Sequence, residues 1–169
     1  MALDIRGVSE TLRRLENIGE RSNAVASALL KQAAEDLHKR VKLQTHRDTG
    51  ALERAIRMRR IQRAGINGRT VFEVYIDPEA RRRVRRRDGS VTRRRVATYG
   101  RRLESGEWGR TLGPGSQRKQ AEVSATDPRL RVGPGFISRS VEFIRRRYVR
   151  KIRQAVQQEV RNSNRGRRR

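Results

Sequence analysis

Cysteine is absent from the 169 residues of this chain, which excludes disulfides and thiolate metal sites. Aromatic residues make up only 4%, so the core must be largely aliphatic and few rings remain for stacking on nucleic-acid bases. No apolar run approaches the roughly 20 residues of a membrane span, and residues 1–14 lack the apolar stretch of a signal peptide. We therefore expect a protein made and kept in cytosol-like conditions, with no membrane partner.

Negative charge is also scarce. The chain holds 43 Lys and Arg against 18 Asp and Glu, a net charge of +25. The excess is uneven: residues 1–80 have a net charge of +4, residues 81–102 of +10 and residues 103–169 of +11. Such charge predicts a polyanionic neighbour, such as nucleic acid or an acidic protein surface. The first half has an ordinary balance, so the charge is concentrated in one segment and the C-terminal end.

Asp48-Thr49-Gly50 is the tripeptide of aspartic proteases, in which the Asp pairs with a second Asp on a loop packed by apolar neighbours. Here the flanking residues are polar on one side and helical on the other. A helix cap by Asp48 or Thr49 explains the pattern better, with Gly50 allowing a tight turn into the helix.

Other candidate chemistry is equally sparse. His38 and His46 lie eight residues apart without further ligands of the kind a metal needs. Glu104 and Glu107 are close enough in the sequence to form a carboxylate pair, but nothing in the sequence indicates a pocket around them. We interpret them as solvated or interface charges. No P-loop and no Ser-His-Asp arrangement occurs in the sequence. We expect no enzyme, no cofactor, no metal and no small-molecule substrate.

Hydrophobic spacing predicts three helical regions. The first comprises a helix over Ser9–Ile18, ended by Gly19, and a longer helix over 20–45. A short helix follows over 51–56, and a last helix runs from about Ser138 to Val160. The predicted buried stripes are Val25, Ala28, Leu29, Ala33, Leu37 and Val41 in the long helix, and Val141, Ile144, Tyr148, Ile152, Ala155 and Val156 in the last one.

Between the predicted helices, apolar residues recur at every second position, as in a β-strand. Strands are predicted over 58–64 and 70–76, joined by a turn at 65–69, with Phe72, Val74 and Ile76 on one face. Residues 81–95 read RRRVRRRDGSVTRRR and predict a β-ribbon turning at Asp88-Gly89. Since this ribbon has almost no apolar face, we expect it to project. One or two helical turns are expected over 97–105, a long loop over 108–128 and a short strand over 129–132.

The predicted fold class is therefore α+β. A long N-terminal helix and a C-terminal helix pack on a small antiparallel sheet, and an Arg-rich β-ribbon arm projects from it. We expect one domain over residues 1–160, with the basic insertion at 81–95, and a basic tail over 161–169.

Three ordered motifs resemble the neck, or tail-completion, proteins of tailed bacteriophages. They are THRDTGALERAI at 45–56, ATYGRRLESGEWG at 97–109 and GPGFISRSVE at 133–142. The matching residues are Asp48, Thr49, Gly50, Leu52, Tyr99, Leu103, Glu104, Gly106, Pro134, Phe136, Ile137 and Ser140. The resemblance spans roughly residues 8–160, and the Arg-rich segment and the long loop depart from the family pattern.

The resemblance implies a structural virion protein assembled in the host cytoplasm. Such proteins form a ring at the head–tail junction, between the portal-side connector and the tail, around the DNA conduit. Six-fold symmetry is favoured over twelve-fold. The implied partners are other copies, the adjacent head-connector and tail proteins, and genomic DNA through non-specific contact.

The candidate contact residues are the arginines of the ribbon: Arg81, Arg82, Arg83, Arg85, Arg86, Arg87, Arg93, Arg94 and Arg95. They would face either the DNA lumen or an acidic neighbouring ring. The alternative to a neck protein is a stand-alone, sequence-independent nucleic-acid-binding protein, ribosome- or nucleoid-associated, whose affinity would fall steeply with salt.

Overall fold

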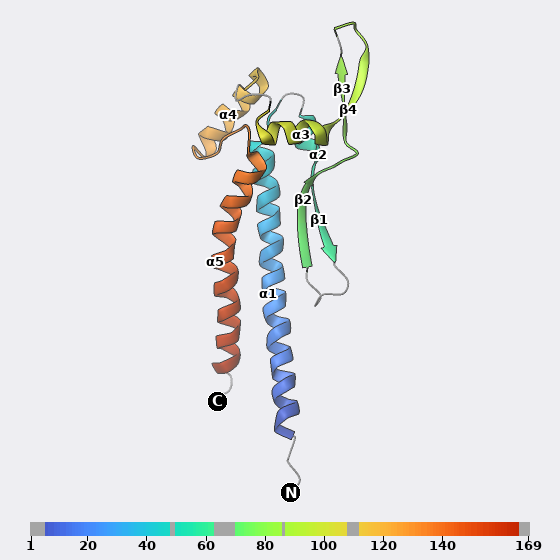
Figure 1. Ribbon diagram of the computed structural model, residues 1–169. Coiled ribbons are helices and arrows are strands. Elements are labelled where there is room, and N and C mark those ends of the chain that lie inside the picture. Colours follow the sequence, from blue (N-terminus) through green and yellow to red (C-terminus); the bar gives the residue numbers. More distant parts are fainter. Residues whose placement is uncertain (1–5, 48–49, 63–69, 86, 108–111, 166–169) are drawn as a thin grey trace. The chain divides into compact units, whose positions relative to one another are not determined.

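The computed structural model describes residues 6–47, 50–62, 70–85, 87–107 and 112–165 (Figure 1). The elements in chain order are α1 (Arg6–Gln44), α2 (Ala51–Ala55), β1 (Ile56–Gln62), β2 (Thr70–Ile76), β3 (Arg81–Arg85), β4 (Val91–Arg95), α3 (Val96–Ser105), α4 (Pro114–Thr126) and α5 (Phe136–Arg165). The predicted α+β class, with long N-terminal and C-terminal helices, is confirmed. Within the described residues the strands form two antiparallel pairs, β1-β2 and β3-β4.

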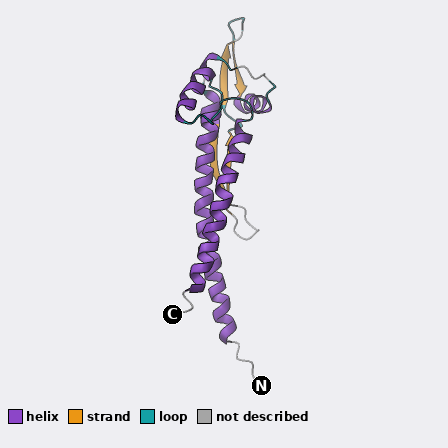
Figure 2. Ribbon diagram, turned by 90° about the vertical axis from the view of Figure 1, so that its left-hand side faces the viewer, coloured by secondary structure: helices purple, strands orange, loops and turns teal. Residues whose placement is uncertain are grey.

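The chain divides into two compact units. One contains Met1–Ala33 and Arg145–Arg169, and the other Ala34–Ile144. In the first unit α1 and α5 lie side by side, as Figures 1 and 2 both show. Ala33 and Tyr148 are buried on the facing helices, as their stripes predict. The single domain over 1–160 and the separate tail stay predictions.

Two helix predictions need correction. α1 continues through Gly19, where the sequence predicted a break. Glycine costs a helix interior only about 1 kcal/mol relative to alanine, so an isolated glycine does not end a helix when the residues on both sides favour it.

Two residues of the predicted buried stripes, Ala28 and Val141, are exposed. In α5 the fully buried Ser140 takes the inward position instead of Val141.

The second unit has a small aliphatic core where the end of α1, α2, the start of β1, α3 and the start of α5 meet. Its buried members are Val41, Leu52, Ala55, Ile56, Val96, Leu103 and Phe136. Phe136 is completely buried, and burial of a side chain of this size contributes about 1.5–3 kcal/mol. The expected aliphatic core is thus present, built around one aromatic ring.

The β1-β2 pair presents the predicted alternating pattern. Ile76 lies opposite Ile56, and Val74 opposite Met58. Paired residues share a face, so the side of β2 that carries Val74 and Ile76 is the side that packs on the core. The predicted turn at 65–69 lies outside the described residues.

The predicted long loop over 108–128 is wrong for most of its length, because residues 114–126 form α4. Pro114 starts this helix, a position where its missing N–H costs nothing. The buried residues of α4 are Ser116, Lys119 and Val123, at helical spacing. Two of these three are polar, so the helix has no apolar stripe that a hydrophobic pattern could reveal.

The predicted strand over 129–132 is also wrong. Instead of pairing with another strand, this segment is held by the side chain of Gln120 on α4. The Gln120 amide nitrogen donates to the Leu130 carbonyl at 3.1 Å, and its oxygen accepts from the Val132 N–H at 2.6 Å. A side-chain amide thus satisfies backbone groups that a neighbouring strand would otherwise pair.

Two helical glycines give opposite expectations for stability. A Cβ on Gly19 would meet nothing within 4 Å, whereas one on Gly100 would lie 2.5 Å from Ile76 Cδ1 and 3.0 Å from Leu52 Cδ1. We expect Gly19→Ala to stabilise the protein by about 0.5–1 kcal/mol. Gly100→Ala should cost about 1–2 kcal/mol, because overpacking the core outweighs the gain in helix propensity. Urea unfolding followed by circular dichroism measures both, and equal effects would contradict this packing.

Candidate functional site

Glu104 joins the second sequence motif to the third. It lies at the end of α3, and its carboxylate reaches the first turn of α5. One oxygen accepts from the Ile137 N–H at 2.9 Å, and the other from the N–H and hydroxyl of Ser138 at 2.9 and 2.6 Å. The first N–H groups of a helix have no partners within it and carry partial positive charge. The Glu104 carboxylate accepts hydrogen bonds from these N–H groups, and its negative charge offsets their partial positive charge. Glu104 therefore acts as the N-terminal cap of α5.

Most other motif residues have structural positions. Leu52, Leu103 and Phe136 are buried in the core, and Tyr99 and Ile137 pack against it.

The motif glycines set the chain direction at helix ends. Gly50 precedes α2 with a φ of 70°, and Gly106 follows α3 with a φ of 78°. Left-handed backbone of this kind favours glycine. Pro134 lies close to Gly106, since a Cβ on that glycine would lie 3.7 Å from the Pro134 Cβ.

The cap predicted from Asp48 and Thr49 lies outside the described residues. The residue at the cap position of α2 is Gly50, which makes no side-chain hydrogen bond. A functional role for any of the motif residues stays a prediction.

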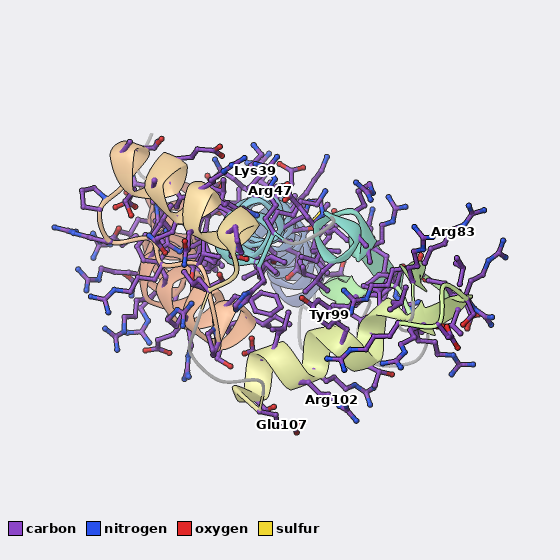
Figure 3. All side chains as sticks on the ribbon, turned by 90° about the horizontal axis from the view of Figure 1, so that it is seen from above. Lys39, Arg47, Arg83, Tyr99, Arg102 and Glu107 are labelled. Carbon is purple, nitrogen blue, oxygen red and sulfur yellow. The ribbon has the colours of Figure 1, made fainter. Side chains whose placement is uncertain are left out.

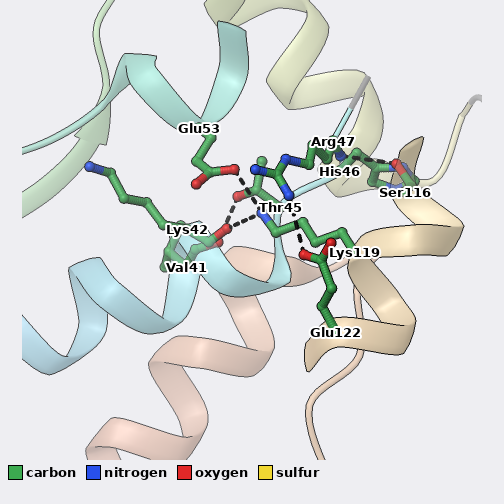
Figure 4. A network of polar contacts seen from close by, with 9 residues as sticks. All are labelled: Val41, Lys42, Thr45, His46, Arg47, Glu53, Ser116, Lys119 and Glu122. Carbon is green, nitrogen blue, oxygen red and sulfur yellow. Dashed lines mark hydrogen bonds and ion pairs between the residues drawn. The ribbon is translucent and has the colours of Figure 1, made fainter. Parts of the chain in front are cut away.

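A polar network that the sequence did not reveal connects the end of α1 with α2 and α4 (Figure 4). The side chain of Lys119 is only 5% exposed. Its ammonium donates to the Lys42 carbonyl at 2.5 Å and contacts the Glu53 carboxylate at 3.0 Å. Burial lowers the pKa of Lys119, and Glu53 opposes that shift. The lysine therefore satisfies a free carbonyl at the C-terminal end of α1 while a carboxylate offsets its charge.

His46 belongs to the same buried region. Its Nδ1 lies 3.5 Å from the Ser116 hydroxyl, which also accepts from the Arg47 N–H at 2.9 Å. Its Nε2 is buried and has no hydrogen-bond partner within the described part of the chain. Burial, and then the positive charges of Arg139 and Lys119, lower the pKa of His46. The neutral imidazole is therefore the form that fits this site.

Arg139 is a second residue that sequence reasoning missed. From the first turns of α5 its guanidinium donates to the carbonyls of Arg131, Gly133 and Pro134, and to the Gln44 side-chain oxygen at 3.2 Å. One side chain thus fixes the segment before α5 and ties it to the end of α1. Arg139 lies within the third motif, but it is not one of the residues that match the family pattern.

The predicted ribbon is present as the β3-β4 hairpin. Its tip is organised by Asp88, which accepts from the N–H and hydroxyl of Ser90, and by Gly89 at a φ of 81°. These hydrogen bonds from Ser90 lower the pKa of Asp88. The turn at Asp88-Gly89 is therefore confirmed, whereas the projection of the ribbon as an arm stays a prediction.

The hairpin places arginine opposite arginine at three successive positions: Arg81↔Arg95, Arg82↔Arg94 and Arg83↔Arg93. Like charges directly opposite each other destabilise a strand pair. Because paired residues share a face and faces alternate, one face carries Arg81, Arg83, Arg85, Arg93 and Arg95, all exposed. The other face carries Arg82 and Arg94. Arg87 is exposed at the turn, and Arg86 lies outside the described residues. The structure thus brings the predicted contact arginines together on one small element.

Over the described ranges, no three His, Asp or Glu side chains gather as a metal would need. The Glu104 carboxylate caps α5, whereas that of Glu107 lies 3.7 Å from Arg102. A search of the same ranges finds no helix with the length and apolar character of a membrane span.

Comparison with known families gives a match to a family of bacteriophage proteins. Residues 9–106 match the family model HK97-gp10-like, described as "Bacteriophage HK97-gp10, putative tail-component". The matched region is more than half of the chain and runs from α1 to the end of α3; it contains the first sequence motif and the second as far as Gly106. No curated protein and no solved structure matches the chain.

The lowered pKa of His46 makes stability depend on pH. The folded protein resists protonating this imidazole, so the unfolded chain binds more protons as the pH falls through its ordinary value of about 6.5. Folding stability should therefore drop on acidification from about pH 7.5 to about pH 5.5, until the lower folded pKa is passed. His46→Gln should show a smaller drop in urea unfolding over this range. Identical pH slopes in the two proteins would contradict the assignment.

Proposed function

Because the chain belongs to the HK97-gp10-like family of bacteriophage tail components, we propose that it forms a ring at the junction between head and tail. The ring would connect the portal-side connector to the tail and surround the DNA conduit. The match over residues 9–106 is the observation that carries this proposal. Membership of the family makes the chain a structural component of the virion that contacts other virion proteins.

A ring suits the physical character of the chain. Copies that meet through two different surfaces close into a ring when the rotation between them allows it. The helices of the first unit expose Leu30, Val149 and Val160, at 40%, 52% and 39%. These apolar side chains are available for burial against a neighbouring copy. We favour six copies over twelve.

The exposed arginine face of the hairpin is the proposed contact with a polyanion. Its repelling cross-strand pairs would be relieved by a negatively charged neighbour. A conduit lined with arginine would retard DNA, because each phosphate contact adds to affinity. We therefore favour contact with an acidic neighbouring ring, or with a DNA end held before ejection.

No catalytic activity is part of this proposal, and we place assembly in the cytoplasm of the host. The alternative of a stand-alone nucleic-acid-binding protein rests on net charge alone. The family match favours the structural role, because it covers helices and strands that carry an ordinary charge as well as the basic hairpin.

The direct test of the proposed function is deletion of the gene from the phage genome. We expect DNA-filled heads and separate tails in electron micrographs of lysates, because the joining ring would be missing. Supplying the wild-type protein in trans should restore joined particles and infectivity. Normal joined virions from the deletion strain would overturn the proposal.

Charge reversal at the hairpin tests the polyanion contact. Changing Arg85, Arg86 and Arg87 to Glu should block joining, because the tip would then repel an acidic neighbouring ring. The matched control changes the same three positions to Lys and should keep joined particles. If the Glu variant joins heads and tails normally but leaks DNA, the hairpin faces the DNA lumen instead.

A further inference from the structure

A cavity of about 320 Å³ lies between the base of the β3-β4 hairpin and α3. It is lined by Arg82, Arg94, Arg95, Thr98, Tyr99 and Arg102, and is called the arginine cavity below. Figure 3 shows Tyr99 and Arg102 on α3, with Arg83 on the hairpin. The volume is at the lower end of the range for ligand pockets, about 300–1,000 Å³, and suits one or two side chains.

Strand register explains why Arg82 and Arg94 line the cavity, whereas Arg95 reaches it from the end of β4 and Arg102 from α3. Arg82 and Arg94 are a cross-strand pair, so their side chains leave the same face of the hairpin. The Arg82 guanidinium lies over the Tyr99 ring, 4.1 Å from its centroid. Tyr99 in turn packs against the core. The ring therefore gives the cavity a fixed apolar wall and positions one guanidinium plane.

Charge makes the arginine cavity selective for anions. Four guanidinium groups line it, and none of the described lining residues is acidic. The carboxylate of Glu107 lies 3.7 Å from Arg102, in a pair whose side chains are both more than half exposed. Such an exposed ion pair contributes little free energy, so it competes weakly with a bound anion. The planar, forked donors of an arginine match a carboxylate, which can accept two parallel hydrogen bonds from one guanidinium.

We propose that the arginine cavity binds carboxylate side chains from an acidic segment of a neighbouring virion protein. The identity of this partner as a virion protein rests on the proposed function, whereas the chemistry of binding does not. The cavity differs from the exposed arginine face, since it is concave, has an aromatic wall and takes Arg82 and Arg94 from the other side of the hairpin, sharing only Arg95 with that face. It would supply specificity where the exposed face supplies general attraction.

A peptide fits the arginine cavity better than duplex DNA does. The phosphates of a duplex lie on a wide convex surface and are best met by outward-facing side chains. The exposed face, with Arg83 and Arg93, has that geometry. A glutamate or aspartate side chain extends from its backbone and can enter a concavity that a duplex backbone only covers. The Tyr99 ring and the Thr98 methyl group can contact the aliphatic part of such a side chain.

The experiment compares two double variants of the full chain that remove equal charge from adjacent positions. Arg94→Gln with Arg102→Gln removes two cavity arginines, whereas Arg93→Gln with Arg101→Gln removes two neighbours that do not line it. All four residues are exposed, so the fold should persist, and thermal melts verify this. Fluorescence anisotropy measures binding of a labelled hexaglutamate peptide at about 150 mM salt.

We expect the cavity variant to weaken peptide binding at least about tenfold, since charge-assisted hydrogen bonds are lost. The control variant should weaken it less than about threefold, because only general attraction falls. Equal losses, or no peptide binding by the wild type, would overturn the proposal. A DNA duplex of about 20 base pairs is the second probe. Loss of duplex binding in the cavity variant alone, with peptide binding retained, would assign the cavity to nucleic acid instead.

These outcomes are separable from those of the proposed function. Peptide binding by the purified chain does not depend on ring formation or on virion joining. Joined virions after gene deletion would remove the neck role while leaving the cavity result intact. Failure of peptide binding would remove the cavity inference while leaving the family assignment intact.

Discussion

The second unit depends on the hydrogen bonds between the Glu104 carboxylate and the first turn of α5. They fix the point at which the last helix begins, and that point places Phe136 at the centre of the core. A helix start displaced by one residue would turn this side chain by about 100° and take it out of the core. The carboxylate belongs to the last turn of α3, two residues before the left-handed Gly106. Two segments far apart in the sequence are thereby joined at one charged group.

Sequence reasoning was most successful where apolar spacing carries the information. The stripe ending at Val41 predicted the burial of α1, and the alternation through Val74 and Ile76 predicted β2 with its inward face. The Asp88-Gly89 pair gave the hairpin turn. Each of these signals is local, because a few neighbouring residues set both the backbone geometry and the face that is buried. The first two motifs lie in the region that matches the family, and Leu52 and Leu103 within them fill the core.

The sequence was least informative where polar side chains do structural work at long range. Lys119, His46 and Arg139 bond to backbone or side-chain groups more than 65 residues away in at least one contact each. Nothing near them in the chain distinguishes them from solvated residues. The arginine cavity belongs to the same class: a run of arginines predicts charge, but only the pairing register separates Arg82 and Arg94 from the arginines on the other face.

The polar buried face of α4 bears on the order in which the protein folds. Hydrophobic collapse draws together segments that have apolar surface to hide, and α4 offers little beyond Val123. Its anchors are the carbonyl of Lys42 and the carboxylate of Glu53, which lie at fixed positions only after α1 and α2 have formed. We therefore expect α4 to dock late, onto a surface already built. An element that joins last is also among the first to detach, which makes α4 the natural place for the second unit to loosen locally without unfolding.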